Sequence, residues 1–340
     1  MVAGPPAVAR YCYRSNDNKY PRGPESMARI PTSGIQHALR AGDYEAVIAS
    51  VGATLRSLTF QGRDLVVPFD ADDVRPSYRG ATLAPWPNRV VDGRYTFGGV
   101  ERVLALTEPA RSHALHGLAS WLDFEAIDKG PDHVTLTAVI QPQTAYPWRI
   151  VVTTTFALGP DGLTQSVTAR NESTEPAPWG TGPHPYLVAG EGLVDDWTLD
   201  LPAAQVLAVT PDRLIPTDLV AVDADEPQRF GFRSARPIGA VEIDHAYSGL
   251  VRDDAGLATV RVTVADGTGV EMSWDAACPW VQIHTADKPE ASLSRLGLAV
   301  EPMTCAPDAF NADAYAYDAG LIVVEPGGTA EASWRIAAIS

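Results

Sequence analysis

The chain has 340 residues, of which 45% are hydrophobic and 20% are charged, and its net charge is −16. This apolar content is enough for a sizeable core and argues against wholesale disorder. Residues 1–40 sum to +4 and the remainder to −20, so the acidic body would repel a phosphate backbone and we exclude nucleic acid as a partner.

The first 34 residues differ in character from the rest. Residues 1–34 are rich in Pro, Arg, Asn and Ser and follow no apolar period, so we expect a disordered leader or an over-extended start, followed by a single domain over residues 35–340. Met27 stands just before the regular pattern and is a candidate for the true start, which would make residues 1–26 dispensable. No signal-peptide core is recognisable, and no run approaches the roughly 18 apolar residues of a membrane helix.

Along the rest of the chain, apolar residues recur at every second position, which is the period of a half-buried strand. The clearest runs span 134–140, 150–156, 163–169, 260–264, 270–274 and 334–338. Gly98-Gly99, Asp161-Gly162 and Asp266-Gly267 stand beside such runs and are typical of hairpin turns. Because no helix with caps at both ends is recognisable, we predict an all-β class, a large antiparallel sandwich.

The three cysteines are Cys12, Cys278 and Cys305. Their odd number and wide spacing fit a reducing cytoplasm better than a disulfide framework. No metal-binding spacing is present, so we expect neither a metal site nor a cofactor.

Several polar residues that could take part in binding or catalysis stand in short motifs. In chain order, Asn88 and Arg89 precede a turn and a strand, and Arg89 could donate to hydroxyls or pair with a carboxylate. His116 follows in SHALHGL, and Asp244 comes later in EIDHAY. Each of these, taken alone, could equally be an ordinary surface or structural residue.

Two further residues have more unusual neighbours. His184 is flanked by Gly182, Pro183 and Pro185, which would fix the backbone and aim the side chain, although a plain turn fits too. Glu301 follows the apolar run LGLAV and precedes a proline, which places it at the end of a predicted strand. Partial desolvation there would raise the pKa of the carboxyl and make it a better base near neutral pH.

Together these residue types suit a sugar. Polar side chains can hydrogen-bond its hydroxyls, and an aromatic ring can pack against its apolar face. The chain resembles the aldose 1-epimerase family, also called galactose mutarotases, over residues 35–340. The order and spacing of five short motifs carry this resemblance. They are Asn88-Arg89, Leu115-His116-Gly117, His184-Pro185-Tyr186, Asp244-His245, and Glu301 with Pro307 to Asn311.

The resemblance implies a β-supersandwich with its site in a cleft on the concave face. It assigns the general base to Glu301, as a carboxylate, and the general acid to His184, as an imidazolium. It assigns binding of the sugar to Asn88, Arg89, His116 and Asp244. The implied activity is interconversion of the anomers of a free hexose such as glucose or galactose, by ring opening and reclosure without a cofactor.

Better-known members have HGG where this chain has His116-Gly117-Leu118, a departure that bears on sugar preference. One alternative substrate is an anionic hexose, phosphorylated or sulfonated, which would require a basic cluster near the cleft, with Arg79, Arg89 and Arg94 as candidates. A non-catalytic sugar-binding protein of the same fold is a second alternative. A glycoside hydrolase using Glu301 and Asp244 is a third. The acidic charge favours a neutral hexose, and we expect a monomer or a homodimer.

Overall fold

The computed structural model describes residues 29–340, and Pro31–Ser340 form one compact unit. Most of the predicted leader, including Met27, lies outside the described residues. The compact unit begins four residues before the predicted domain boundary, and the amide of Ser33 donates to the carbonyl oxygen of Ala71 over 3.0 Å.

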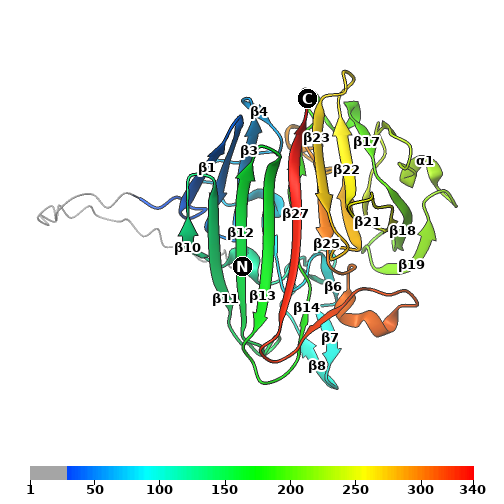
Figure 1. Cartoon of the computed structure of the whole chain (residues 1–340). Helices are drawn as coiled ribbons and strands as arrows, with labels where there is room; N and C mark the ends of the chain where they lie inside the picture. Colours follow the sequence, from blue (N-terminus) through cyan, green and yellow to red (C-terminus); the bar gives the residue numbers. More distant parts are fainter. Residues whose placement is uncertain (1–28) are drawn as a thin grey trace, which may run out of the picture. The chain divides into compact units, whose positions relative to one another are not determined.

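The largest sheet has nine antiparallel strands and confirms the period-two prediction. Buried and half-buried residues alternate along its long strands, and Asp161-Gly162 turns the chain from one strand into the next. Figure 1 shows β27 in the middle of this sheet, between β13 and β23. In spatial order the strands are β10 (Glu125–Lys129), β11 (His133–Ile140), β12 (Ile150–Gly159), β13 (Gly162–Asn171), β27 (Thr329–Ile339), β23 (Gly269–Trp274), β22 (Ala258–Thr263), β17 (Thr198–Asp200) and β20 (Arg236–Pro237).

Two smaller antiparallel sheets complete the frame. The six-stranded sheet contains, in spatial order, β16 (Tyr186–Leu187), β25 (Leu298–Met303), β24 (Trp280–His284), β21 (Asp244–Leu250), β18 (Ala203–Val209) and β19 (Pro216–Ala221). The four-stranded sheet runs in chain order through β1 (Gln36–Ala41), β2 (Tyr44–Ala49), β3 (Thr54–Phe60) and β4 (Arg63–Asp64).

A single large core joins these three sheets. It includes Phe156 from the nine-stranded sheet, Leu58 from the four-stranded sheet, and Ile283 and Val300 from the six-stranded sheet. Since neighbouring residues of a strand point to opposite faces, the residues that alternate with Ile283 and Val300 face away from this core. The far face of the six-stranded sheet is therefore free to carry polar groups.

Short strand pairs and turns connect the sheets. The pairs are β14 (Ala177–Trp179) with β26 (Ile322–Val324), β15 (Gly182–Pro183) with β5 (Thr82–Leu83), β6 (Arg89–Val91) with β9 (His113–Leu115), and β7 (Arg94–Phe97) with β8 (Val100–Val103). Within residues 29–340 the one α-helix is α1 (Pro227–Phe230), beside 3₁₀ turns at Pro76–Tyr78, Ala119–Trp121, Val194–Asp196, Ala291–Leu293 and Ala309–Ala314. The predicted all-β class is confirmed.

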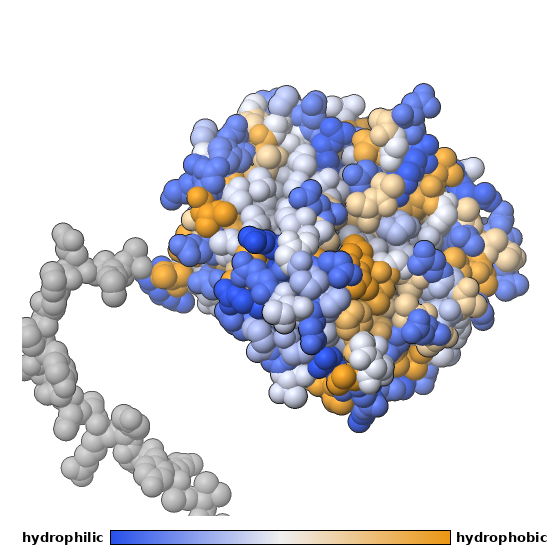
Figure 2. All heavy atoms as spheres, turned by 60° about the horizontal axis from the view of Figure 1, so that its bottom comes forward, coloured by the Kyte–Doolittle hydropathy of each residue, from blue (hydrophilic) through white to orange (hydrophobic). Residues whose placement is uncertain are grey.

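The surface shown in Figure 2 carries mostly hydrophilic and neutral residues, and hydrophobic ones stand in separate groups. Scattered apolar residues of this kind are ordinary on protein surfaces. Among the described residues, no helix is long and apolar enough to cross a membrane, and Cys278 and Cys305 are buried free thiols.

Candidate active site

A cavity of about 300 Å³ lies on the far face of the six-stranded sheet, and all six residues predicted for the site line it. Its walls come from strands and loops spread over most of the described chain. The lining residues are Ser77, Tyr78, Asn88, Arg89, Glu108, Arg111, Leu115, His116, His184, Tyr186, Asp244, Gln282, His284, Asp287, Lys288 and Glu301.

The pairing of the strands explains the polar floor of this cavity. Glu301 on β25 stands opposite Gln282 on β24, and Asp244 on β21 stands opposite His284 on β24. Residues directly opposite in an antiparallel pair share a face, and so do residues two apart on one strand. The four side chains therefore form a compact patch. The sequence predicted that Glu301 ends its strand, but it lies within β25.

His184 lies between β15 and β16, where backbone bonds fix its position. Its amide donates to the carbonyl oxygen of Ala81 over 3.1 Å, and its own carbonyl oxygen accepts from the amide of Gly80 over 2.7 Å. The imidazole stacks on the Tyr186 ring, with 5.1 Å between centroids. Its Nε2 lies 3.5 Å from Oε1 of Glu301, and both side chains are buried. The structure thus brings together the residues predicted to be the general base and the general acid.

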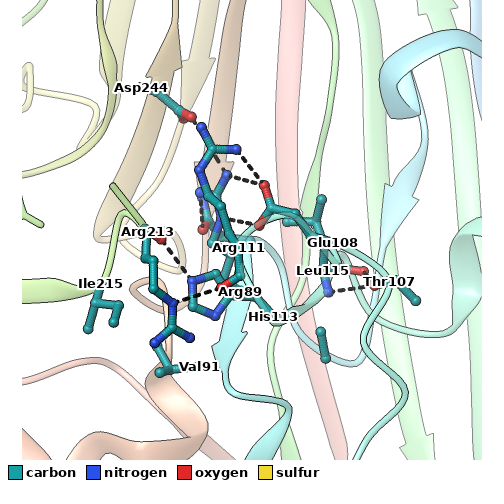
Figure 3. Close-up of polar contacts among 12 residues, drawn as sticks. Arg89, Val91, Thr107, Glu108, Arg111, His113, Leu115, Arg213, Ile215 and Asp244 are labelled. Atoms are coloured by element: carbon teal, nitrogen blue, oxygen red, sulfur yellow. Dashed lines mark hydrogen bonds and ion pairs between the residues drawn. The ribbon is translucent and has the colours of Figure 1, made fainter. Parts of the chain in front are cut away.

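Arg89, the first residue of β6, is buried among acidic groups, as Figure 3 shows. Its Nε lies 2.7 Å from Oε2 of Glu108, and its Nη2 lies 3.6 Å from Oδ2 of Asp244. Arg111 contacts the same Glu108 carboxylate over 2.9 Å. Although burial opposes it, hydrogen bonding to Arg89 holds the pKa of Glu108 below its ordinary value. Glu108 therefore stays charged and fixes the direction of the Arg89 guanidinium.

Several cavity residues have backbone angles that side chains rarely adopt. Ser77, Tyr78, Asn88 and His116 all have φ between +47° and +60°. Residues other than glycine in this region cost of order 1–3 kcal/mol each, and they tend to cluster at functional sites. At Gly117, φ is +71° and an added Cβ would collide with the Ala84 carbonyl oxygen, so the turn after β9 requires glycine.

Burial changes the protonation expected for the proposed acid and base. Burial, together with the neighbouring His284, lowers the pKa of His184 to about 3. Burial and the Asp244 carboxylate raise the pKa of Glu301 well above its ordinary value, against the opposing charge of Arg89. The two shifts favour a pair that holds one proton over a wide pH range, with that proton on Glu301. This differs from the carboxylate and imidazolium assigned from the sequence, because the sequence does not show how deeply both groups are buried.

Asp244 behaves differently from Glu301. Burial alone would raise its pKa, but His284, Arg89 and a 2.7 Å hydrogen bond from Gln282 hold it at about 2. Asp244 therefore stays charged, as Glu108 does, whereas Glu301 retains a proton. Such divergent environments are how proteins assign different roles to two acids.

Five buried side-chain atoms of the cavity have no hydrogen-bond partner among residues 29–340. They are Nε of Arg111, Nδ1 of His116, Nδ1 of His184, Oε1 of Gln282 and Oε2 of Glu301. An unsatisfied buried polar group costs about 1–3 kcal/mol, so a cluster of five suits a ligand that carries hydroxyls. Residues 29–340 contain no group of three or more His, Cys, Asp or Glu side chains placed to hold a metal ion.

Several lining residues were not predicted from the sequence. Gln282 and His284 alternate with Val281 and Ile283 in VQIH, and this alternation was a usable signal for a polar face. Glu108, Arg111 and Lys288 lie in loops, where no period marks them. Conversely, Arg94, a candidate for a basic cluster, is exposed and paired with Glu101 over 2.7 Å.

The chain resembles known proteins along nearly its whole described length. It matches the family described as aldose 1-epimerase over residues 36–337. It is 37% identical to YihR, an uncharacterized Escherichia coli (strain K12) protein, over 286 residues, which are 84% of this chain and 89% of YihR.

Two solved structures show the shared fold. A galactose mutarotase-like protein from Clostridium acetobutylicum superposes with a TM-score of 0.77 at 17% identity, covering 89% of this chain and 94% of that one. The galactose 1-epimerase of Lactobacillus acidophilus NCFM superposes with a TM-score of 0.70 at 14% identity, covering 88% and 92%.

Proposed function

The chain belongs to the aldose 1-epimerase family, and we propose that it interconverts the α and β anomers of a free hexose. The observation that carries the proposal is the buried pair of His184 and Glu301, 3.5 Å apart in a polar cavity. Binding a sugar would not by itself require a proton-exchanging pair shielded from water. The pair is suited to a reaction in which one proton leaves the sugar and another returns.

Ring opening uses the pair in one of its two one-proton forms. The Glu301 carboxylate takes the proton of the C1 hydroxyl while the His184 imidazolium gives its proton to the ring oxygen. The bond between C1 and the ring oxygen breaks, and a C1 aldehyde forms. The pair now has its proton on Glu301, which is the form that burial favours.

Ring closure runs the same transfers backwards. After rotation about the C1–C2 bond, His184 takes the proton of the C5 hydroxyl and Glu301 protonates the aldehyde oxygen. The ring recloses on the other face of C1. Each positioned proton transfer is worth roughly 10²–10⁴-fold in rate. The number of protons on the pair is the same before and after the cycle, so no cofactor is required.

The remaining polar residues hold the sugar. Asp244 can accept from hydroxyls because its low pKa keeps it charged, and Arg89 can only donate. The partnerless atoms of His116 and Gln282 supply further positions for hydroxyl groups. We therefore assign binding to these four residues and to Asn88, which accepts from Nη1 of Arg89 over 3.3 Å.

A polarimetric assay tests the proposal. Freshly dissolved α-D-glucose and α-D-galactose should relax to anomeric equilibrium faster with the protein than without it, after subtraction of the spontaneous rate. Binding of the sugar without faster relaxation would overturn the catalytic proposal and leave a sugar-binding protein. Release of nitrophenol from nitrophenyl glycosides would instead indicate a hydrolase.

An anionic hexose is a second candidate substrate, and Lys288 is the observation that favours it. Lys288 and Arg111 both line the cavity, and Arg111 already pairs with Glu108. The two cations would suit a phosphate or sulfonate at the cavity rim. If glucose 6-phosphate is the better substrate, Lys288→Gln should lower its kcat/KM and leave that of glucose unchanged.

The cytoplasmic location and the monomeric or homodimeric state remain predictions from the sequence. Size-exclusion chromatography with light scattering tests the second of these.

A further inference from the structure

A second cavity of about 580 Å³ adjoins the candidate active site. The two share three lining residues, Ser77, Tyr186 and Lys288. A molecule bound in the first cavity therefore contacts residues that also border the second.

The lining of the second cavity is of a different kind. Most of its lining is apolar, including Val67, Phe69, Leu293 and Leu296, and its charged members are Asp73, Arg79, Lys288 and Glu290. The first cavity presents buried ionisable groups instead. Apolar side chains form most of the lining of the second cavity, so an apolar group bound there would gain from burial.

The loop that carries Leu293 is firmly anchored. The amide of Arg295 donates to the carbonyl oxygen of Ala286 over 3.0 Å and closes the base of the loop. The Arg295 guanidinium lies 2.6 Å from Asp287 and 2.7 Å from Asp195. Leu293 is nevertheless 52% exposed. The fold thus holds an apolar side chain in water at the wall of this cavity, where a bound group could cover it.

Tyr186 indicates which part of the sugar points toward the second cavity. Its ring stacks on His184, with 5.1 Å between centroids. In the proposed function, on which this step rests, His184 acts at the ring oxygen. C6 is joined to C5, the neighbour of that oxygen, so O6 is the hydroxyl oxygen nearest to the shared wall. C1 must keep a free hydroxyl and cannot carry a substituent.

We propose that the substrate is a hexose bearing an apolar acyl or arylmethyl group on O6, and that the second cavity binds this group. The sugar ring then occupies the polar cavity, with its anomeric centre at Glu301 and His184. Selectivity over an unsubstituted hexose comes from the apolar wall, which takes no part in proton transfer.

The test compares D-glucose, 6-O-benzyl-D-glucose and 3-O-benzyl-D-glucose as free sugars. We expect kcat/KM for the 6-O-benzyl sugar to exceed that for glucose by about tenfold or more, because a phenyl group is buried. The 3-O-benzyl sugar should gain nothing. Leu293→Asp should return the 6-O-benzyl value to that of glucose and leave glucose turnover within about twofold of its original value. Ile127→Asp is the control, because Ile127 is similarly exposed, at 59%, and belongs to β10.

The outcomes separate this proposal from the proposed function. Turnover of glucose without a gain for the 6-O-benzyl sugar overturns the apolar-group proposal alone, and so does a preference for glucose 6-phosphate over the benzyl ether. If no sugar is turned over, the proposed function fails. Calorimetric Kd values then decide, because tighter binding of 6-O-benzyl-D-glucose than of glucose supports the second cavity as a binding site and equal binding overturns it.

Discussion

Replacing Glu301 by Gln should slow anomer exchange by up to about 10⁴-fold at pH 7. The amide keeps the shape of the side chain but cannot hold the proton of the pair. His184 is then the remaining group of the pair that can carry this proton, and burial has lowered its pKa to about 3. At pH 7 that is about four pH units above the pKa, so about one molecule in 10⁴ carries the imidazolium. His184 is also neutral at pH 7 in the unmodified protein, so the loss comes from the missing base and is expected within the roughly 10²–10⁴-fold usual for a general acid or base.

The pH profile makes this prediction sharper. In the unmodified protein the pair keeps one proton between the lowered pKa of His184 and the raised pKa of Glu301. The rate should therefore be flat across neutral pH. It should fall near pH 3, where a second proton removes the base, and at high pH, where loss of the last proton removes the acid. The Glu301→Gln rate should instead rise about tenfold for each unit that the pH is lowered from 7 toward 3.

Polarimetry with α-D-glucose at a series of pH values measures both profiles. Glu331→Gln is a suitable control, since Glu331 is an exposed carboxylate on β27. A Glu301→Gln protein that retains a near-normal rate, or whose rate does not change with pH, would refute the one-proton pair.

Two further substitutions test the surrounding charges. Asp244→Asn removes a negative charge that helps to raise the pKa of Glu301, so the alkaline limb of the pH profile should move to lower pH; an unmoved limb contradicts this. Glu108→Gln takes the 2.7 Å ion pair from the buried Arg89, and the free energy of unfolding in urea should fall by about 3 kcal/mol. Glu101→Gln, which breaks an exposed ion pair of the same length, should change it by less than about 1 kcal/mol, and equal losses in the two variants would argue against a buried role for Glu108.

The fold class could be predicted from the sequence because the period-two alternation of a strand is visible within a few consecutive residues. Alternation over 150–156 and 163–169, with Asp161-Gly162 between them, is enough to define β12, β13 and their turn. The six site residues could be named because each stands in a short motif. Their common location on one cavity depends on pairing between strands that are far apart in the sequence. Local patterns do not reveal this pairing.

What the sequence could not provide is the environment of each group. Glu108 is one of many acidic loop residues until the fold places Arg89 beside it. The protonation of His184 depends on how completely the cavity walls exclude water, and those walls come from many separate segments. Reasoning from single residues predicts the raised pKa of Glu301 but not the lowered pKa of His184, and so it assigns the wrong protonation state to the imidazole.

The position of β27 has a consequence for how the protein is made. This strand follows every other described strand in the chain, yet it joins β13 to β23 in the middle of the nine-stranded sheet. During synthesis the two halves of that sheet must wait, each with an open edge, until residues 329–339 leave the ribosome. Open edges invite pairing with other chains, and contacts between distant segments form slowly. A newly made molecule is therefore most prone to aggregate just before its last strand is inserted.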